Sequence, residues 1–426
     1  MTYYLIVSAS AFVLGLLLFL PILGTKRVLM LQLLALPLAH VYAGGAAIGA
    51  SLLIYTIDVL RKRKRLYMPR TLVTCWGFWA LATALSMTVN ENTQRTLFQS
   101  AEFAFYGFVA LAIAHIFITS GKQALHLLYA AWLGSVALSL VMLFFGITSE
   151  TWPQYIPGKN EGSFYLLMGS VIIPFYLIQY SKGKVKLALW ASIVLTMFTT
   201  LYAQSRGGLS GAIGLVSIYL ILKLVRKPAY AFSSIFALTI LSVVYLDPIL
   251  NFYDEMFTLL FDFDRNFSNL ERLAVLELSY ELFLESPWLG NGFGSIDRIL
   301  TKTVVTDGIY PHPHNTYAHF AVELGVLGLT FLALLFFGIF YNSVKAYRRS
   351  IVPEFIFCFL LFLAFLSTSF VFATFYGASR ALISSIAIGA ALGALEHKLK
   401  QRKSGTQYWV EEIIEQNEGV DDLKVA

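Results

Sequence analysis

The chain is built from long apolar runs separated by short polar segments. Most runs extend over about 18–25 residues, the length at which a helix crosses a hydrocarbon core of ~30 Å. Strands of a membrane β-barrel would instead alternate apolar and polar residues over about ten positions. The pattern therefore predicts an all-α polytopic membrane protein with about twelve transmembrane helices. The predicted spans are residues 3–23, 28–60, 71–89, 97–119, 124–148, 164–181, 187–204, 207–225, 229–246, 316–343, 353–375 and 381–395.

These spans divide the chain into four parts. Helices one to nine fall in residues 1–246, a large and partly helical outer loop in 247–315, helices ten to twelve in 316–395, and a cytoplasmic tail in 396–426. The run 28–60 is long for one crossing, and Gly44-Gly45 is a place where it could divide to give thirteen helices. The first run lacks a basic leader and a clear cleavage site, so we expect it to be retained as a span.

The distribution of charge predicts the orientation of the helices. Only 13% of residues are charged, against about a quarter in soluble domains, and 58% are hydrophobic. The formal net charge of +6 comes from basic clusters between spans, which is typical of cytoplasmic loops rather than of a nucleic-acid-binding surface. The clusters expected on the cytoplasmic side, with both termini, are Arg61–Arg65, Lys182 to Lys186, Arg226-Lys227, Arg348-Arg349 and Lys398–Lys403. Lys26-Arg27 would lie outside with twelve spans and inside with thirteen.

Arg206 stands at a predicted tight outer turn, between Gln204-Ser205 and Gly207-Gly208. A guanidinium group at the membrane surface can hold a phosphate or diphosphate through paired, charge-assisted hydrogen bonds, and glycines let a ligand approach the backbone. The alternative is an arginine that anchors the helix end by extending to the interface. Taken alone, the residue fits both interpretations.

A second outer cation, Arg272, lies in a predicted helix of the large loop. Ser268 and Glu271 form a capping-box pattern ahead of the run 269–285, which ends before Pro287. Arg272 either binds a ligand or is an exposed helix residue paired with one of the nearby acids. Further outer cations with the same two interpretations are Arg265, Arg298 and Arg380.

Histidines gather at the end of the outer loop, in the stretch Pro311 to Asn315, with His319 further along. The prolines bias this stretch away from helix and put His314 at the start of the next helix, at the membrane surface. Imidazole can act as a base near neutral pH, so His314 is a candidate catalytic base. A structural cap and a metal site are the alternatives. The spacing of His312 and His314 would need further metal ligands, and the two cysteines lie in separate apolar runs.

Three acids, Asp58, Glu102 and Glu323, fall within predicted spans, where an ionisable group must face protein or water. Asp58 lies near a basic cluster and fits an interfacial partner. Glu102 and Glu323 could line a cavity near the outer surface. Because a proton-coupled transporter would use such groups, transport is an alternative of a different functional class.

Four short patterns lie in order on the predicted outer side, between residues 205 and 328. They are Ser205-Arg206-Gly207-Gly208, Arg272-Leu273-Ala274-Val275-Leu276, the segment Pro287 to Gly294, and His314-Asn315 followed after nine residues by Gly325-Val326-Leu327-Gly328. They resemble the S-R-G, R-x3-L, loop and H-[NSQ]-x9-G-x-x-G elements of the O-antigen ligase and polymerase superfamily of bacterial envelope glycosyltransferases. The N-terminal half resembles this family only in its hydropathy, and the twelve-span count agrees with the family.

The resemblance implies a GT-C-like, metal-independent, inverting glycosyltransferase in the bacterial inner membrane, with its site facing the periplasm. The donor would be a glycan on undecaprenyl diphosphate, and the acceptor a sugar hydroxyl of lipid A–core. Arg206 and Arg272 would bind the diphosphate and stabilise its developing charge. His314 would take the proton from the acceptor, with Asn315 and His312 in support. No cofactor, metal, nucleotide or nucleic acid is expected.

A polymerase joins two lipid-linked repeats. Like a ligase, it must bind the diphosphate of the donor and activate a hydroxyl group of the acceptor. The complete histidine–glycine and arginine–leucine patterns favour the ligase. A protein O-oligosaccharyltransferase of the same superfamily fits less well, because no large outer domain follows the last predicted span. The polymerase and the proton-coupled transporter are the alternatives to be tested.

Overall fold

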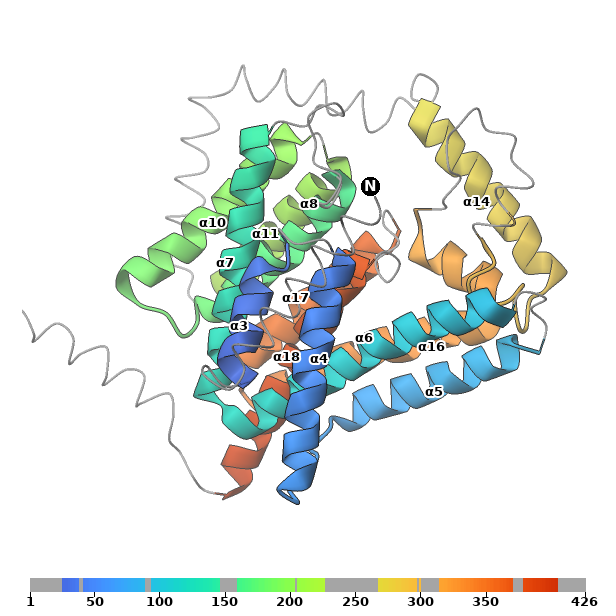
Figure 1. The fold of residues 1–426 in the computed structure, drawn as a ribbon. Coiled ribbons are helices and arrows are strands. Elements are labelled where there is room, and N and C mark those ends of the chain that lie inside the picture. Colours follow the sequence, from blue (N-terminus) through green and yellow to red (C-terminus); the bar gives the residue numbers. More distant parts are fainter. Residues whose placement is uncertain are drawn as a thin grey trace, which may run out of the picture.

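The computed structural model describes residues 25–37, 41–88, 93–145, 159–203, 205–226, 267–296, 299, 314–370 and 378–404. Most of these residues are helical, the others lie in turns or connecting stretches, and no strand occurs among them (Figure 1). The helices are α3 (Thr25–Ala35), α4 (Val41–Arg61), α5 (Arg70–Ser86), α6 (Thr93–Ser120), α7 (Lys122–Phe145), α8 (Lys159–Leu167), the π-helix η1 (Met168–Ile172), α9 (Ile173–Leu177), α10 (Gly183–Tyr202), α11 (Arg206–Arg226), α14 (Phe267–Glu285), α16 (Thr316–Arg348), α17 (Val352–Thr368) and α18 (Ala378–Ser404). The expected all-helical fold is confirmed for this part of the chain.

Several of these helices have the length and composition of membrane spans. Within the described residues, five are long and apolar enough to cross a bilayer: Thr96–Ser120, Ala124–Phe144, Gly183–Tyr202, Thr316–Arg348 and Arg380–Lys403. Shorter apolar helical segments are Glu161–Leu177, Gly207–Lys223 and Val352–Thr368. The predicted spans 3–23 and 229–246 lie outside the described residues. The chain is a multi-pass membrane protein, and the total of twelve spans stays a prediction.

The run 28–60 forms two helices, not the single helix of the twelve-span interpretation. α3 ends at Ala35 and α4 begins at Val41, so the division precedes Gly44-Gly45. Pro37 lies in the stretch between the two helices. Its ring and its missing N–H oppose a continuous helix, which gives the division a physical cause.

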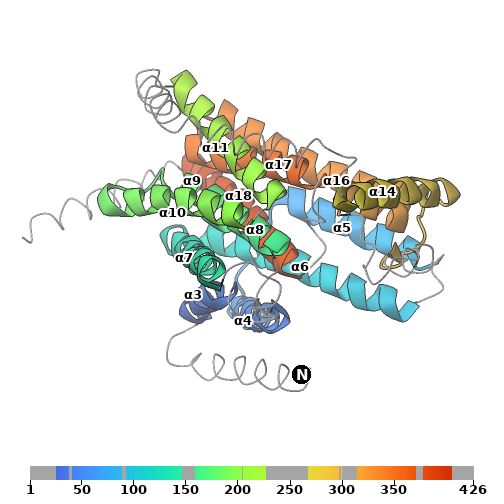
Figure 2. The ribbon, with the colours of Figure 1, turned by 90° about the horizontal axis from the view of Figure 1, so that it is seen from above.

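α3 and α4 form an antiparallel hairpin. The two helices pack on each other, and they lie side by side in Figures 1 and 2. Lys26 of α3 lines the same cavity as Lys62, which follows the last residue of α4. Lys26 therefore lies with the basic cluster 61–65, as the thirteen-span interpretation requires and the twelve-span interpretation does not.

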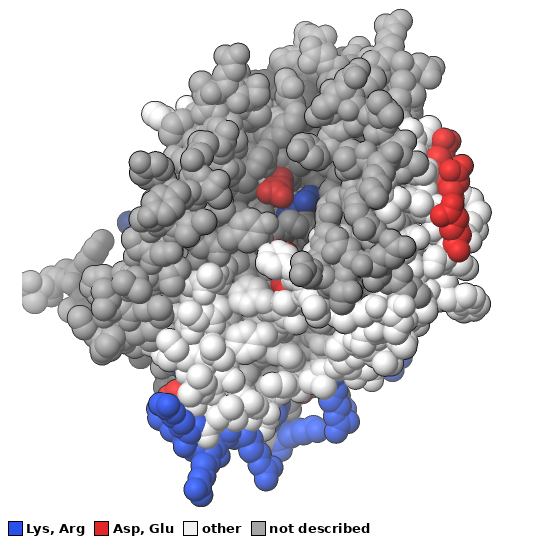
Figure 3. Space-filling view, turned by 45° about the vertical axis from the view of Figure 1, so that its right-hand side comes forward, with Lys and Arg blue, Asp and Glu red and all other residues white. Residues whose placement is uncertain are grey.

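Basic side chains gather at one end of the molecule, at the bottom of Figure 3, which we call the basic end. Lys345 Nζ lies 3.2 Å from Glu396 Oε1, and Arg402 donates to the carbonyl oxygen of Arg349, so the ends of α16 and α18 meet there. Lys400 Nζ lies 3.3 Å from the centre of the Tyr67 ring, which joins α18 to the chain after α4. The clusters 61–65, 348–349 and 398–403 thus share one end, as the positive-inside pattern predicts.

α6 and α18 cross closely near the middle of the bundle (Figure 2). A Cβ on Gly393 would lie 2.6 Å from the carbonyl oxygen of Ala114, and a Cβ on Gly389 would collide with that of Ala110. Small residues let helix backbones approach where lipid supplies no hydrophobic force between helices. α16 and α17 also pack on α18, and α17 on α11. These contacts fix the ends of α11, α16 and α17 that lie away from the basic end, which we call the outer end.

Candidate functional site

α16 is broken at Gly325, towards its outer end. Gly325 has φ 59° and ψ −145°, a conformation that is strained for any residue with a side chain. A Cβ at this position would also lie 2.5 Å from the carbonyl oxygen of Pro287. The backbone conformation therefore requires a glycine at the first position of the G-x-x-G pattern. The break separates the first turns of α16, which begin at Thr316, from the remainder of the helix.

The segment 286–296 enters this break and bonds the backbone groups that the helix leaves unpaired. Three backbone–backbone bonds between described residues join the two elements: Val326 N–H to the Pro287 carbonyl (2.8 Å), Asn291 N–H to the Val322 carbonyl (2.8 Å) and Gly292 N–H to the Glu323 carbonyl (3.1 Å). Gly290 has φ 68°, and a Cβ there would collide with the backbone of Glu323. Two of the four sequence patterns, the segment Pro287 to Gly294 and the G-x-x-G pattern, thus form one structural unit.

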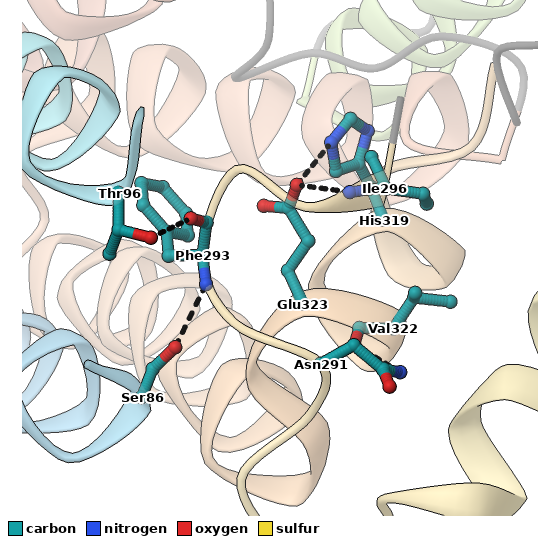
Figure 4. A network of polar contacts seen from close by, with 8 residues as sticks. All are labelled: Ser86, Thr96, Asn291, Phe293, Ile296, His319, Val322 and Glu323. Atoms are coloured by element: carbon teal, nitrogen blue, oxygen red, sulfur yellow. Dashed lines mark hydrogen bonds and ion pairs between the residues drawn. The ribbon is translucent and has the colours of Figure 1, made fainter. Parts of the chain in front are cut away.

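The far end of the same segment is held by α5 and α6, as Figure 4 shows. Phe293 N–H donates to Ser86 Oγ at 2.8 Å, and the Phe293 carbonyl accepts from Thr96 Oγ1 at 2.9 Å. The buried Phe293 ring packs against aromatic rings of α5, α6 and α16, namely Trp79, Phe103 and Phe320. The segment therefore fastens the outer ends of three helices together.

Glu323 is fully buried in this junction. Its Oε1 accepts from the Ile296 N–H at 3.2 Å and lies 3.4 Å from His319 Nε2, one turn earlier in α16 (Figure 4). Glu102 accepts a hydrogen bond from the Tyr106 hydroxyl at 2.6 Å. Both acids are engaged by nearby protein groups, and neither lines the groove described below. The proton-coupled transporter stays an alternative to be tested.

His314 and Asn315 form the start of α16. Asn315 is the N-cap residue, and its Oδ1 accepts from the Ala318 N–H at 3.0 Å. His314 is half-buried and has φ 46°. A positive φ is uncommon in residues other than glycine, and such strain concentrates at functional sites. The imidazole is thus held at a helix N-terminus, where the helix dipole favours anions.

The start of α16 is tied to the end of α17. The ties are Thr316 N–H to the Ser369 carbonyl (2.8 Å), the Asn315 side-chain amide to the Phe370 carbonyl (3.5 Å) and the Tyr317 hydroxyl to the Leu366 carbonyl (3.1 Å). The rings of Tyr317 and Phe370 also pack, with centroids 4.7 Å apart. The position of His314 is therefore fixed relative to α17 as well as to α16.

Arg206 is the first residue of α11, after a short turn from α10. Its backbone is described, and its side chain lies outside the described part of the structure. The turn is compact, because Ser205 N–H donates to the Thr200 carbonyl at 3.0 Å. Gly208 allows α11 to approach α8, since a Cβ there would lie 2.6 Å from Ser163 Cβ. The expected tight turn at the S-R-G pattern is confirmed.

A buried polar cluster lies beside the start of α11. The hydroxyls of Ser163 and Ser205 are buried, and neither has a hydrogen-bond partner among the described residues. Two residues earlier in α8, Glu161 Oε1 lies 3.5 Å from Arg380 Nη2 of α18, and Arg380 is only 7% exposed. Unpaired hydroxyls away from water cost free energy, so this cluster suits a polar group of a ligand.

A groove of about 570 Å³ runs between α11 and α17. Its α11 side consists of small residues on one helix face, Gly207, Ser210, Gly211 and Gly214, with Leu215 and Ile218 beyond them. Its α17 side consists of Leu363, Leu366, Ser367, Thr368 and Phe370. The groove is mainly apolar, and at Gly207 it reaches the residue next to Arg206.

Arg272 lies in α14, and its side chain is outside the described part of the structure. The helix expected in the loop is confirmed, although it begins at Phe267, one residue before the expected cap Ser268. Val275 and Leu282 of α14 are buried against Val322 of α16 and Ile296, with Leu278 and Ile299 beside them. This packing holds the helix that carries Arg272 against the first half of α16.

α17 brings the separate parts together. Its last residues and the turn to Phe370 line the groove that begins at Gly207, and the same residues bond the start of α16 beside His314. α16 in turn carries α14. The helices that contain Arg206 and Arg272 and the helix that follows His314 are thus joined at the outer end. His312 lies outside the described residues.

Sequence reasoning missed the groove and the Glu161–Arg380 pair. The small residues of α11, spaced three and four apart, were a readable signal of a helix face that admits a ligand or a second helix. No sequence signal pairs Glu161 with Arg380, because only tertiary packing brings α8 to α18. Among the described residues, no group of three or more His, Cys, Asp or Glu side chains is placed to hold a metal ion.

Residues 191–333 match the family model described as O-antigen ligase. The matched stretch runs from α10 to the middle of α16. It contains the turn at Arg206, the helix α14, the segment 286–296 and the His314-Asn315 pair. No match to the chain was found among curated proteins.

Proposed function

Since residues 191–333 support membership of the O-antigen ligase superfamily, we propose that this protein is an O-antigen ligase. The family supports an O-antigen ligase or polymerase type of function. In our proposal the chain is a metal-independent, inverting glycosyltransferase of the bacterial inner membrane. It moves a glycan from undecaprenyl diphosphate to a sugar hydroxyl of lipid A–core at the periplasmic face.

The observation that carries this proposal is the junction at the end of α17. One side of this helix end forms the groove that begins beside Arg206, and its terminal carbonyls bond the start of α16 beside His314. A lipid-linked donor needs a site that opens sideways to the membrane, with cations at the depth of the lipid head groups. The groove and the two adjoining helix starts support such an arrangement.

In this proposal the groove between α11 and α17 holds the polyisoprenoid chain of the donor. Gly214 leaves room for an apolar chain beside α11, since no described residue lies within 4 Å of a Cβ built on it. Leu363 and Leu366 supply apolar contacts from α17. A chain in this groove leads to Gly207 and so places its diphosphate beside Arg206.

The diphosphate then meets several groups that favour negative charge. α11 and α16 both begin near the end of the groove, and helix N-termini attract phosphate through their dipoles and their free N–H groups. Arg206 is the first residue of α11, and in this proposal Arg272 reaches the diphosphate from α14. Guanidinium groups make strong paired hydrogen bonds to phosphate oxygens, and in a water-poor site they stabilise the charge that develops as the diphosphate leaves.

His314 is the proposed base. The acceptor hydroxyl oxygen attacks the anomeric carbon, its proton passes to the imidazole, and the bond from the anomeric carbon to the diphosphate oxygen breaks with both electrons on the leaving group. Attack from the face opposite the diphosphate inverts the anomeric centre. Asn315 supports this step by capping α16, which fixes the backbone that carries the imidazole.

The experiment uses the purified full-length protein in lipid with an undecaprenyl-diphosphate-linked glycan. Wild-type protein is expected to transfer the glycan to added lipid A–core, and His314→Ala to lose transfer. His126→Ala is the matched control, because His126 is an exposed histidine of α7 away from the junction. Full transfer by His314→Ala would contradict the base assignment.

The same reaction separates the alternatives. A ligase gives glycan on lipid A–core, whereas a polymerase gives longer lipid-linked glycan without any lipid A–core. A transporter gives neither product and moves a solute across vesicles in a manner that depends on Glu102 or Glu323. Product identity therefore decides between the three functions.

A further inference from the structure

A second cavity, of about 790 Å³, lies at the basic end of the molecule, away from the proposed reaction site. Three helices form it: the first turn of α3, the last turns of α4 with the chain that follows, and the last turns of α6. Its lining residues are Lys26, Tyr55, Asp58, Val59, Lys62, Lys64, Arg65, Tyr67, His115, Thr119 and Ser120. This lining is strongly basic and rich in hydrogen-bond donors.

The charges in this cavity do not cancel. Asp58 is the sole acid among the described lining residues, and it pairs with Lys62 at 2.7 Å. Lys64 and Arg65 add two further positive charges on the same wall. Lys26 of α3 also lines the cavity, and its Nζ donates to Ser120 Oγ at 2.7 Å. Cations from α3 and from the chain after α4 therefore line one concavity.

The backbone after α4 is turned back so that these cations face the cavity. Arg63 has φ 51°, a left-handed conformation that usually falls to glycine at the end of a helix. Lys64 N–H donates to the Val59 carbonyl at 3.1 Å and Arg63 N–H to the Leu60 carbonyl at 2.9 Å, which closes the turn. The positive φ of Arg63 strains its backbone. Because the chain turns back at this residue, Lys64 and Arg65 line the cavity.

His115 adds a polar ring to the wall. Its Nδ1 lies 3.0 Å from the backbone nitrogen and 3.3 Å from the backbone oxygen of Tyr67, and the two rings lie nearly parallel, with 11° between their planes. Tyr67 therefore holds the imidazole in place beside the lysine and arginine side chains of the lining.

We propose that this cavity binds a phosphate-bearing anion at the basic end of the protein. Its source is either the head group of an anionic phospholipid in the adjacent leaflet or a free phosphate compound. The basic end is the predicted cytoplasmic end, and basic pockets between transmembrane helices on the cytoplasmic side bind the head groups of anionic lipids. A topology signal alone would not need a cavity: Lys182, Lys184 and Lys186 belong to the same predicted side, and none of them lines this cavity. The lining cations Lys62, Lys64 and Arg65 are also exposed, so the cavity is open to solvent.

The test measures binding to the purified, delipidated full-length protein with two kinds of probe. One probe is phosphatidylglycerol, compared with phosphatidylcholine, in nanodiscs examined by native mass spectrometry. The other is inorganic phosphate or glycerol 1-phosphate, examined by calorimetry. Phosphatidylglycerol binding alone identifies a lipid head group as the ligand, whereas binding of the soluble probes identifies a free phosphate.

The variants compare the cavity with the open surface. Lys64→Glu with Arg65→Glu should weaken binding by roughly 25-fold or more, at about 5-fold per cation removed. Lys184→Glu with Lys186→Glu makes the same change of charge outside the cavity and should weaken it far less. Lys64→Gln with Arg65→Gln serves if charge reversal impairs folding, which thermal unfolding detects. Absence of binding by every probe, or equal losses in the cavity and control variants, would overturn the proposal.

Discussion

Gly325→Ala is the substitution that tests most sharply how the outer end is assembled. Gly325 has φ 59° and ψ −145°, and alanine in this region is strained by about 1–3 kcal/mol. The new Cβ would lie 2.5 Å from the Pro287 carbonyl oxygen and 2.7 Å from the carbonyl carbon of Trp288. Both are backbone atoms, so the segment 286–296 must move to make room.

The cost of that movement follows from the bonds at the break. If the Pro287 carbonyl moves away, the Val326 N–H loses its acceptor, and a polar group left unpaired away from water costs about 1–3 kcal/mol. Together with the strain, the expected loss of stability is about 2–6 kcal/mol. Most single substitutions cost about 0.5–3 kcal/mol, so the upper part of this range would be diagnostic.

The assay combines thermal unfolding in detergent, hydrogen exchange of residues 286–296 and glycan transfer. Gly325→Ala should unfold earlier, expose this segment to exchange and lose transfer. Gly77→Ala is the matched control, because Gly77 lies in helix α5 and no described residue lies within 4 Å of its Cβ position. If both variants are equally stable and equally protected, the segment does not hold the break in α16.

Three further predictions concern the groove, the topology and the cap. Gly214→Leu should lower the rate of glycan transfer about 10-fold, because each methylene of the donor chain that it displaces is worth about 0.8 kcal/mol. The control Gly77→Leu should leave the rate unchanged. If the two variants are equally active, the groove is not part of the donor site. Arg27→Cys should react with an impermeant maleimide from the same side of the membrane as Lys184→Cys, because α3 begins at the basic end. Both native cysteines are buried, so they should not add to the labelling. Labelling of the two variants from opposite sides would contradict the hairpin. Asn315→Ala should lower the free energy of unfolding by about 1 kcal/mol while Asn315→Asp retains the cap; equal stability of the two variants would exclude the capping role.

The helices could be predicted because long apolar runs leave the backbone few choices in a membrane. The single span predicted for 28–60 is two helices, and they divide near Pro37, a stronger helix breaker than the alternative Gly44-Gly45. The position of Lys26 was the second available signal. The twelve-span interpretation puts Lys26 on the outer side, where it is an exception to the positive-inside pattern. In the structure Lys26 lies at the basic end.

The candidate site was predicted as a set of positions, not as an arrangement. Short patterns marked Arg206, Arg272 and His314, but they did not show that the end of α17 joins the groove beside Gly207 to the start of α16. The role of Asn315 as N-cap was readable from its place before a helical run. The role of Gly325 was not, because a positive φ and a close backbone contact appear only once α16 and the segment after Pro287 are packed together.

The most direct test of the proposed site is the binding of undecaprenyl diphosphate to purified variants, with undecaprenol as the phosphate-free comparison. Arg206→Ala and Arg272→Ala should each lose about 10- to 100-fold in affinity for the diphosphate, from about 1.5–3 kcal/mol per charged hydrogen bond, and bind undecaprenol as before. His314→Ala should keep its affinity for the diphosphate and fail only in transfer. Wild-type affinity for the diphosphate in both arginine variants would contradict a site built from these residues at the outer end.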